Sequence, residues 1–436
     1  MDRRTFMQYS SGIGVFGVFA HPVFGKREFT LKEGITQQMD SLIEQGYFSD
    51  DLSDPKDEAA WEKIQKLFPR VEAFTQLENG YFSHASLPVF KFYQERESYI
   101  QSRTSWFMRK EQHERIEWAR EQLADFFGWN KENLAFTRNT TESLNILISG
   151  FPWKKGDEVI IGNQDYGSMN EAFEQAAQRY GIVLKVAEVP VHPNNAQEVE
   201  EAYLKLIGPQ TRMLHLTHLI NLSGQVIPLD SIVAKTRSLK KDLCTAVDAA
   251  HSVAHVDYIW QSCDADVIAG SLHKWMCTPL GLGFLYMKKQ WIPQVWPLMG
   301  DRGVPQTDIR RFEHQGTRPI QTIESVTEAI KLNHQIGLLN KAKRLKYLQE
   351  SWTKPFRDSK KIQINIPEYP DGSAAIANVS VQGKSPGELA QWLWDKHQIF
   401  TVAIDHPVIK GVRITPHLSN SITDIQKLIA ALRELE

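Results

Sequence analysis

Residues 244–274 read CTAVDAAHSVAHVDYIWQSCDADVIAGSLHK. Two short apolar, β-rich runs lie here, at LCTAVDAA and ADVIAGS, and each ends in residues that carry chemistry. Asp248 closes the first run, and His273 and Lys274 follow the second. A lysine beside apolar residues is more often a surface residue with a buried stem, whereas a partly desolvated amine has a lowered pKa and can react. The choice between these two interpretations depends on the rest of the chain.

Similar β-rich runs recur on both sides of this stretch, at NLAFTRN, DEVIIGNQ, GIVLKVAEV, TRMLHLTHL and GFLYM. Helical stretches such as SMNEAFEQAAQRYG and DSIVAKTRSLKK separate several of them. Residues 112–127 carry apolar groups at helical spacing, and Gly128 follows as a stop signal. Such alternation over ~150 residues predicts an α/β fold, with a mostly parallel central sheet and helices on both faces.

The pattern divides the chain into four parts. Residues 1–25 resemble an export signal, and residues 26–75 are charged and favour helix. Residues 76–325 hold the alternating pattern of a large domain. Residues 326–436 begin with a long helical stretch and end in the amphipathic helix DIQKLIAALRELE, which predicts a smaller α+β C-terminal domain.

Composition limits the classes of function. The chain has 436 residues, of which 42% are hydrophobic and 23% charged, as in a soluble globular enzyme. A formal charge of −2 gives no support to nucleic-acid binding. Three cysteines are too few for a disulfide framework, and past the N-terminus no apolar run reaches the length of a membrane span. We therefore expect neither nucleic acid nor membrane as a partner of the mature chain, and no metal site.

The N-terminus has the layout of a twin-arginine export signal. Arg3 and Arg4 precede Phe6 and a mildly apolar, glycine-rich stretch, and Val18-Phe19-Ala20 is a candidate cleavage site. This layout predicts a periplasmic protein that the twin-arginine machinery exports already folded. The alternative is a cytoplasmic protein in which an arginine pair precedes an apolar segment by chance.

Chemistry-bearing residues follow five of the predicted strands, where ligands bind in open parallel sheets. In chain order they are Thr140 and Thr141, Tyr166, Asn221, Asp248 and His251, then Ser271, His273 and Lys274. Each group also has an ordinary explanation: the threonines could belong to a helix cap, and Asp248 to a salt bridge. Together they offer a phosphate cradle, an aromatic face, a carboxylate and an amine. That set fits pyridoxal 5′-phosphate (PLP), whose aldehyde a lysine holds as a Schiff base while an aspartate faces the ring nitrogen.

Seven motifs together resemble the class V aminotransferase family of fold-type I PLP enzymes: TRNTTESLN, NQDYGSMNEAF, HLINLSGQVIPL, VDAAHSVAH, SLHKW, FEHQGTRP and GVRITPHLSN. The resemblance runs from about Asn79 to the C-terminus. Tyr166 followed by Gly167, VDAAH and FEHQGTRP are similar to the isopenicillin N epimerase-like branch.

The resemblance implies a role for each site residue. Lys274 would form the Schiff base, Asp248 would pair with the pyridine nitrogen, and Tyr166 would stack on the ring. The residues implied to hold the phosphate are Thr140, Thr141, Ser271 and His273, and those implied near the phenolic oxygen are Asn221 and His251. Gly316 and Thr317 match a loop that reaches the phosphate of the neighbouring subunit, which implies a homodimer. Arg413 matches the arginine that clamps the substrate α-carboxylate.

The reaction stays open between several outcomes. Cysteine desulfurases of this family carry a nucleophilic cysteine in the small domain, and the absence of cysteine after Thr278 argues against that chemistry. Freed Lys274 would act as the base at Cα. Returning the proton to the cofactor gives aminotransfer, whereas an acid on the opposite face, for which Tyr166 is a candidate, gives epimerisation. A C–X lyase, or a non-catalytic binding protein that kept the fold, would also fit these residues.

Overall fold

The computed structural model describes residues 41–42, 44–48 and 50–436. The predicted export signal and residues 26–40 of the N-terminal segment lie outside the described residues. In the described part of that segment, the main helix is α3 (Glu58–Gln65), which the Asp57 side chain caps at its start. None of the described helices is long and apolar enough to cross a membrane.

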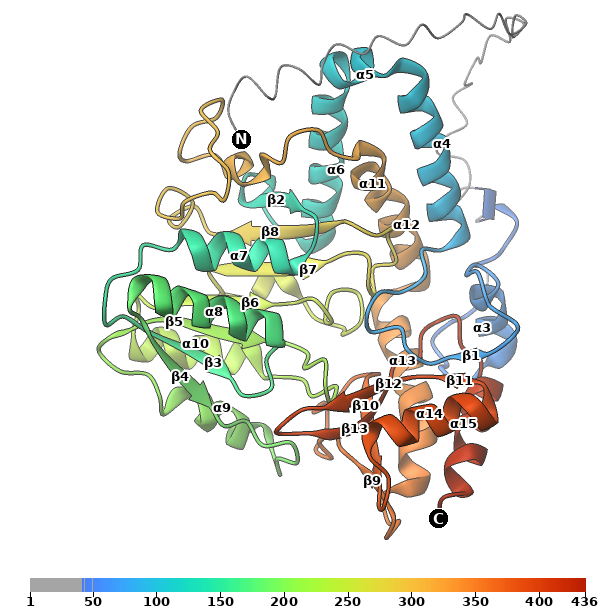
Figure 1. Cartoon of the computed structure of the whole chain (residues 1–436). Coiled ribbons are helices and arrows are strands. Elements are labelled where there is room, and N and C mark those ends of the chain that lie inside the picture. The colour runs from blue at the N-terminus through green and yellow to red at the C-terminus, as the bar shows by residue number, and fades with distance from the viewer. Residues whose placement is uncertain (1–40, 43, 49) are drawn as a thin grey trace, which may run out of the picture. The chain divides into compact units, whose positions relative to one another are not determined.

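A seven-stranded sheet forms the centre of the large domain (Figure 1). Its strands, in their order across the sheet, are β2 (Leu134–Thr137), β8 (Gly283–Met287), β7 (Val267–Ser271), β6 (Cys244–Asp248), β5 (Thr211–Thr217), β3 (Glu158–Gly162) and β4 (Val183–Ala187). Of these seven, β8 alone runs antiparallel to its neighbours β2 and β7. The predicted α/β fold with a mostly parallel sheet is confirmed.

Helices cover both faces of this sheet. They are α4 (Leu87–Arg103), α5 (Ser105–Lys110), α6 (Gln112–Phe127), α7 (Thr140–Gly150), α8 (Gly167–Tyr180), α9 (Ala196–Leu204), α10 (Leu229–Leu239), α11 (Ile320–Glu324) and α12 (Val326–Ile336), with short 3₁₀ turns η1 (Lys131–Asn133), η2 (Trp260–Ser262) and η3 (Ile309–Glu313). Because side chains alternate along a strand, the sheet contributes to two cores. Val159 and Ile161 pack in the core that includes α7 and α8, whereas Ile160 packs in the core that includes α6, α10 and α12.

The C-terminal part has its own small sheet, with strand order β12 (Val402–Asp405), β13 (Lys410–Ile414), β10 (Ala377–Val381) and β9 (Ile362–Ile364), all antiparallel. Its helices are α13 (Leu338–Thr353), α14 (Pro386–His397) and α15 (Ile422–Arg433), with the 3₁₀ turn η4 (Lys354–Phe356). Apolar residues of this sheet and of these three helices form one core. This arrangement is α+β, as the sequence predicts.

Two local features differ from the sequence pattern. The predicted long helix after residue 325 is divided at Gly337, whose φ of 79° is unfavourable for other residues. Strand β1 (Thr75–Gln76) does not join the large sheet but pairs in parallel with β11 (Ile399–Phe400) of the C-terminal part. The chain around residue 76 therefore lies beside the C-terminal part. The domain boundaries remain a prediction.

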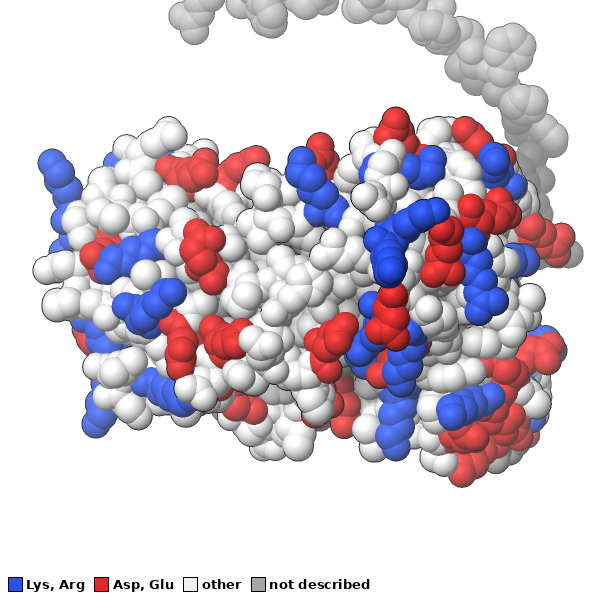
Figure 2. Space-filling view, turned by 90° about the horizontal axis from the view of Figure 1, so that it is seen from below, with Lys and Arg blue, Asp and Glu red and all other residues white. Residues whose placement is uncertain are grey.

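Charges of both signs are interspersed on one face of the molecule. In Figure 2, Lys and Arg side chains lie next to Asp and Glu, and residues of other kinds cover most of the centre of this face. A mixed distribution of this kind does not create a large field of one sign over the face in view.

Candidate active site

A cavity of about 420 Å³ lies at the carboxyl ends of β2, β5, β6 and β7. Ten of the predicted site residues line it: Thr140, Thr141, Tyr166, Asn221, Asp248, His251, Ser271, His273, Lys274 and Arg413. Gly316 and Thr317 do not, because they line a separate groove with residues of α5 and α6. Met108 and Arg109 of α5 also line that groove, whereas Tyr81 lines the cavity itself.

The start of α7 forms one wall of the cavity. The Asn139 side chain caps this helix by accepting a hydrogen bond from the Glu142 amide, so Asn139 and not the threonines forms the cap. Thr140 instead contacts Ser271 of β7: its amide donates to Ser271 Oγ at 3.0 Å, and the two hydroxyls lie 2.8 Å apart. A Cβ on Gly283 would lie 2.7 Å from Asn139 Cα, so glycine there lets β8 pass close to the helix start. Hydroxyls and helix N–H groups are thus concentrated where an anion is favoured.

Lys274 lies in the cavity against His251. The Lys274 Nζ is 2.9 Å from His251 Nε2, and the Trp275 indole donates to His251 Nδ1 at 3.3 Å. Because an indole nitrogen can only donate, Nδ1 of the imidazole must be unprotonated. Burial lowers the pKa of His251 well below its usual value, and Lys274 lowers it further, so the ring is neutral and its proton is on Nε2. His251 is then placed to donate to the lone pair of the Lys274 amine whenever that amine is uncharged.

The surroundings of Lys274 also bring the pKa of its amine toward neutrality. Desolvation lowers the pKa of Lys274 to about 8, and the positive charge of Arg413 acts in the same direction, whereas Asp248 and Glu78 oppose it. A pKa near neutrality is what a reactive amine needs for capturing an aldehyde and for moving a proton. The reactive interpretation of Lys274 fits this geometry better than the surface interpretation.

Asp248 lies at the end of β6 and is buried, with the Ala250 amide donating to its Oδ1 at 2.8 Å. Burial raises the pKa of this carboxyl, and the nearby His215 opposes the rise. His215 is itself paired with buried Asp165, 2.9 Å from Nδ1 to Oδ2, and this carboxylate outweighs the effect of burial and raises the histidine pKa. His215 thus counteracts the effect of burial on the pKa of Asp248, whereas the Asp165 carboxylate acts weakly in the opposite direction.

The cavity also contains polar atoms suited to a ligand. Within the described part of the chain, Asn221 Oδ1 and Thr217 Oγ1 are buried and have no hydrogen-bond partner. Both residues line the cavity, and Tyr166, which immediately precedes α8, lines it with a 45% exposed ring. Unpaired buried acceptors and hydroxyls are costly unless a ligand or water binds them. The residues present therefore fit PLP.

Arg413 has an unexpected partner. Its Nη2 and Nε lie 2.5 Å and 3.3 Å from the carboxylate oxygens of Glu78, and its Nη1 donates to the Asn221 carbonyl at 3.2 Å. The Tyr81 amide also donates to Glu78, at 2.9 Å. Both charged side chains are more than 90% buried. This pair could not be predicted from local sequence, because Glu78 is 335 residues from Arg413 and belongs to no motif of the site.

His215, Asp165 and Thr217 were missed for a different reason. His215 and Thr217 lie within strand β5, in a run that reads as an ordinary apolar strand, whereas Asp165 follows β3 in the NQDYGSMNEAF motif, where only Tyr166 was given a role. A histidine in the TRMLHLTHL run was the available signal, because a buried histidine needs a polar partner. Cys277, which lies three residues after Lys274, is fully buried, and no cysteine belongs to the described lining of the cavity.

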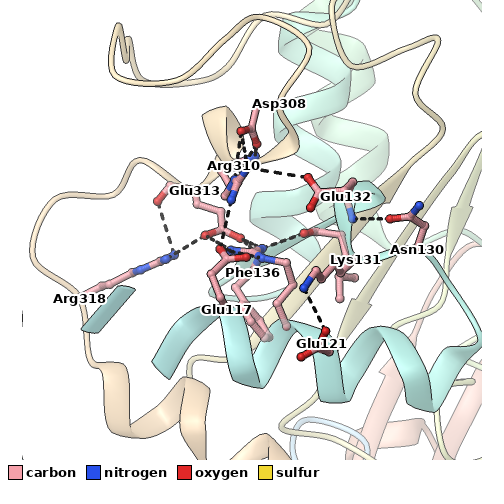
Figure 3. Close-up of polar contacts among 12 residues, drawn as sticks. Glu117, Glu121, Asn130, Lys131, Glu132, Phe136, Asp308, Arg310, Glu313 and Arg318 are labelled. Carbon is pink, nitrogen blue, oxygen red and sulfur yellow. Dashed lines mark hydrogen bonds and ion pairs between the residues drawn. The ribbon is translucent and has the colours of Figure 1, made fainter. Parts of the chain in front are cut away.

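The loop that carries Gly316 and Thr317 is held by a buried ion-pair network (Figure 3). Glu313 of η3 pairs with Arg120 of α6. Its carboxylate also accepts hydrogen bonds from the Arg318 guanidinium at 2.9 Å and from the Phe136 amide at 2.6 Å. Burial alone would raise the pKa of Glu313, but the two arginines outweigh it and hold the pKa at about 2. The network fixes both ends of the Glu313–Arg318 loop to α6 and β2.

The fold and this site define a fold-type I PLP enzyme. The sequence profile described as Aminotransferase class-V matches residues 88–427. The chain therefore belongs to the class-V aminotransferase family, and it is a PLP-dependent enzyme.

Similar proteins differ in their reactions. The chain is 29% identical to the isopenicillin N epimerase of Amycolatopsis lactamdurans over 73% of this chain and 84% of that protein. It is 26% identical to a protein of Pyrococcus abyssi named "Probable cysteine desulfurase" over 74% of this chain and 83% of that one. A C-DES mutant solved with glycine covalently linked to its PLP cofactor has the same fold, with a TM-score of 0.75, 19% identity and coverage of 85% of this chain and 99% of that one. Since epimerase and desulfurase relatives both match, the expectation against desulfuration stays a prediction.

Proposed function

We propose that this enzyme acts on the amino group and Cα of an amino acid or aminoacyl peptide, by aminotransfer or epimerisation. The observation that carries the proposal is Lys274, an amine with a pKa of about 8, in a cavity that also presents Asp248 and a hydroxyl cradle. When bound, PLP supplies a covalent link to the substrate amine and a ring that withdraws electrons from Cα.

Each of the predicted site residues would have a separate role in binding PLP or moving a proton. Thr140, Ser271 and the first turn of α7 would bind the phosphate group. Asp248, buried at the end of β6, would face the ring nitrogen and favour its protonated form. Lys274 would serve as the base that takes the Cα proton, and His251 holds this amine in position, with Lys274 Nζ 2.9 Å from His251 Nε2.

The destination of that proton decides the product. Aminotransfer would require Lys274 to deliver the proton to the cofactor instead of returning it to Cα. Delivery to the opposite face of Cα requires a second acid, and Tyr166 lines the cavity from the start of α8. The epimerase relative, matched over most of both chains, supports this second outcome.

The experiment is a panel of amino acids and N-terminal peptides in deuterated water, with the purified, PLP-loaded protein. Exchange at Cα with inversion and without a keto product identifies an epimerase. Formation of pyridoxamine phosphate and a keto product identifies an aminotransferase. Elimination products identify a lyase, and the absence of both PLP uptake and exchange would contradict the proposal.

We also propose that the enzyme is a homodimer exported to the periplasm. The groove that contains Gly316 and Thr317 lies outside the Lys274 cavity, which fits a loop that serves a second copy. Mixing a K274A chain with a T317D chain should give hybrid dimers with one intact site, although neither variant alone holds PLP firmly. An R3K/R4K double variant that is exported like the wild type would contradict twin-arginine export.

A further inference from the structure

The Glu78–Arg413 pair changes the charge that the cavity offers to a substrate. An Arg413 without an acidic partner would present a full positive charge and a bidentate hydrogen-bond donor to an α-carboxylate. Here Glu78 accepts from Nε and Nη2 of the guanidinium, and the Asn221 carbonyl accepts from Nη1. The pair has no net charge, and a substrate carboxylate would have to approach the buried Glu78 carboxylate.

Glu78 is held in this position by more than Arg413. The Tyr81 amide donates to its Oε1, and the Thr415 hydroxyl lies 3.4 Å from its Oε2. On the neighbouring side, a Cβ on Gly80 would lie 2.9 Å from Arg413 Cζ, so the backbone packs directly against the guanidinium. Expelling Glu78 would leave Arg413 buried without its acidic partner, which is strongly unfavourable.

A second cavity of about 350 Å³ adjoins this pair. Arg413 and Tyr81 line both cavities, whereas Phe82, Phe400 and Val402 line only the second. The second cavity therefore begins where the carboxyl group of a substrate amino acid would end. A free amino acid would leave this space unfilled, whereas a peptide would extend into it.

We infer that Glu78 is a specificity-determining residue, and that the substrate is the N-terminal residue of a peptide, whose neutral amide lies at the Glu78–Arg413 pair while the following residue enters the second cavity. This inference rests on the proposed function, because it assumes that the substrate amine enters the cavity beside Lys274. An amide carbonyl can accept a hydrogen bond from Arg413 without bringing a second negative charge near Glu78.

The test is a binding measurement with three probes: L-alanine, L-alaninamide and L-alanyl-L-phenylalaninamide. Each is titrated into the PLP-loaded protein, and the change in cofactor absorbance gives its dissociation constant. The wild type should bind alaninamide more tightly than alanine, and the dipeptide amide more tightly still. In E78Q, where Arg413 regains its net charge, the preference should move toward alanine by about tenfold or more.

Two further variants complete the design. V402W, which fills the second cavity, should remove the advantage of the dipeptide amide and leave alaninamide binding unchanged. E188Q, which replaces an exposed glutamate outside both cavities, should match the wild type. A wild-type preference for alanine, an alanine-to-alaninamide ratio unaffected by E78Q, or a dipeptide advantage that survives V402W would overturn the inference. Failure of the proposed function would look different, because no probe would then change the cofactor spectrum.

Discussion

The Trp275 indole determines which nitrogen of His251 carries the proton, and the position of that proton affects the pKa of Lys274. With the indole replaced in W275F, Nδ1 of His251 is free to take the proton and Nε2 can accept from a charged amine. We therefore expect the pKa of Lys274 to rise above about 8. The measurement is the rate at which cofactor-free protein captures PLP, followed by absorbance against pH.

The control for this variant is W352F. Trp352 is as fully buried as Trp275, but it packs in the C-terminal core, so its loss costs stability without touching His251. If the pH midpoint of PLP capture shifts equally in both variants, or in neither, the Trp275 indole does not set the tautomer of His251.

Lys274 itself should lower the stability of the cofactor-free protein. Its pKa is about 8 in the folded chain, against an ordinary value of 10.5. Between pH 8 and 10.5 the unfolded chain binds more protons, so stability rises with pH across this window, and the penalty is complete below pH 8. K274M should accordingly stabilise the cofactor-free protein at pH 7 by roughly 1–3 kcal/mol, and the gain should shrink toward pH 10.5.

Urea unfolding of the two proteins at several pH values measures this difference. K241M, which removes an exposed lysine, serves as the matched control. A K274M protein that is less stable than the wild type at pH 7 would contradict a depressed pKa. The same variant should also fail to hold PLP covalently, which absorbance reports independently.

Close packing of β8 against the start of α7 sets the shape of the predicted phosphate cradle. A Cβ on Gly283 would lie 2.7 Å from both Asn139 Cα and the Gly270 carbonyl oxygen, and none of these backbone atoms can move freely. G283A should therefore displace the helix start, weaken PLP binding and cost about 1–3 kcal/mol of stability. G167A, at the start of α8, has open space around its added methyl group and should behave like the wild type. Calorimetric titration with PLP and thermal unfolding compare the two variants.

The elements that carry local signals were the ones that sequence could predict. The run at 112–127 forms α6 with the same bounds, and Gly128 ends the helix with φ of 70°. Both features were predictable because the apolar spacing and the glycine stop signal lie within one short stretch of sequence. The strand ends were predictable for the same reason, since each is an apolar run followed by polar residues. The Glu78–Arg413 pair and the β1–β11 pairing were not, because they depend on how distant segments meet. Gly337 was hidden inside a continuous helical pattern, where a single glycine does not by itself signal a break.

At the scale of the whole molecule, Glu313 ties the loop that carries Gly316 and Thr317 to α6 and β2, so one carboxylate supports both the fold and the predicted subunit contact. E313Q leaves Arg120 buried with only Glu117 as its acidic partner among the described residues. A buried charge that loses its main partner generally costs about 3–5 kcal/mol, so we expect the free energy of unfolding to fall by about that amount at pH 7.

The pH dependence of this loss tests its cause. Because the pKa of Glu313 is about 2 and its ordinary value is 4.5, the stabilisation is complete above pH 4.5 and falls as pH approaches 2. The stability gap between wild type and E313Q, measured by urea unfolding, should therefore stay constant from pH 7 to about 5 and narrow below pH 4.5. E121Q, which removes an exposed carboxylate of the same helix, should match the wild type throughout. A gap that is absent at pH 7, or one that closes above pH 5, would mean that another group holds this loop.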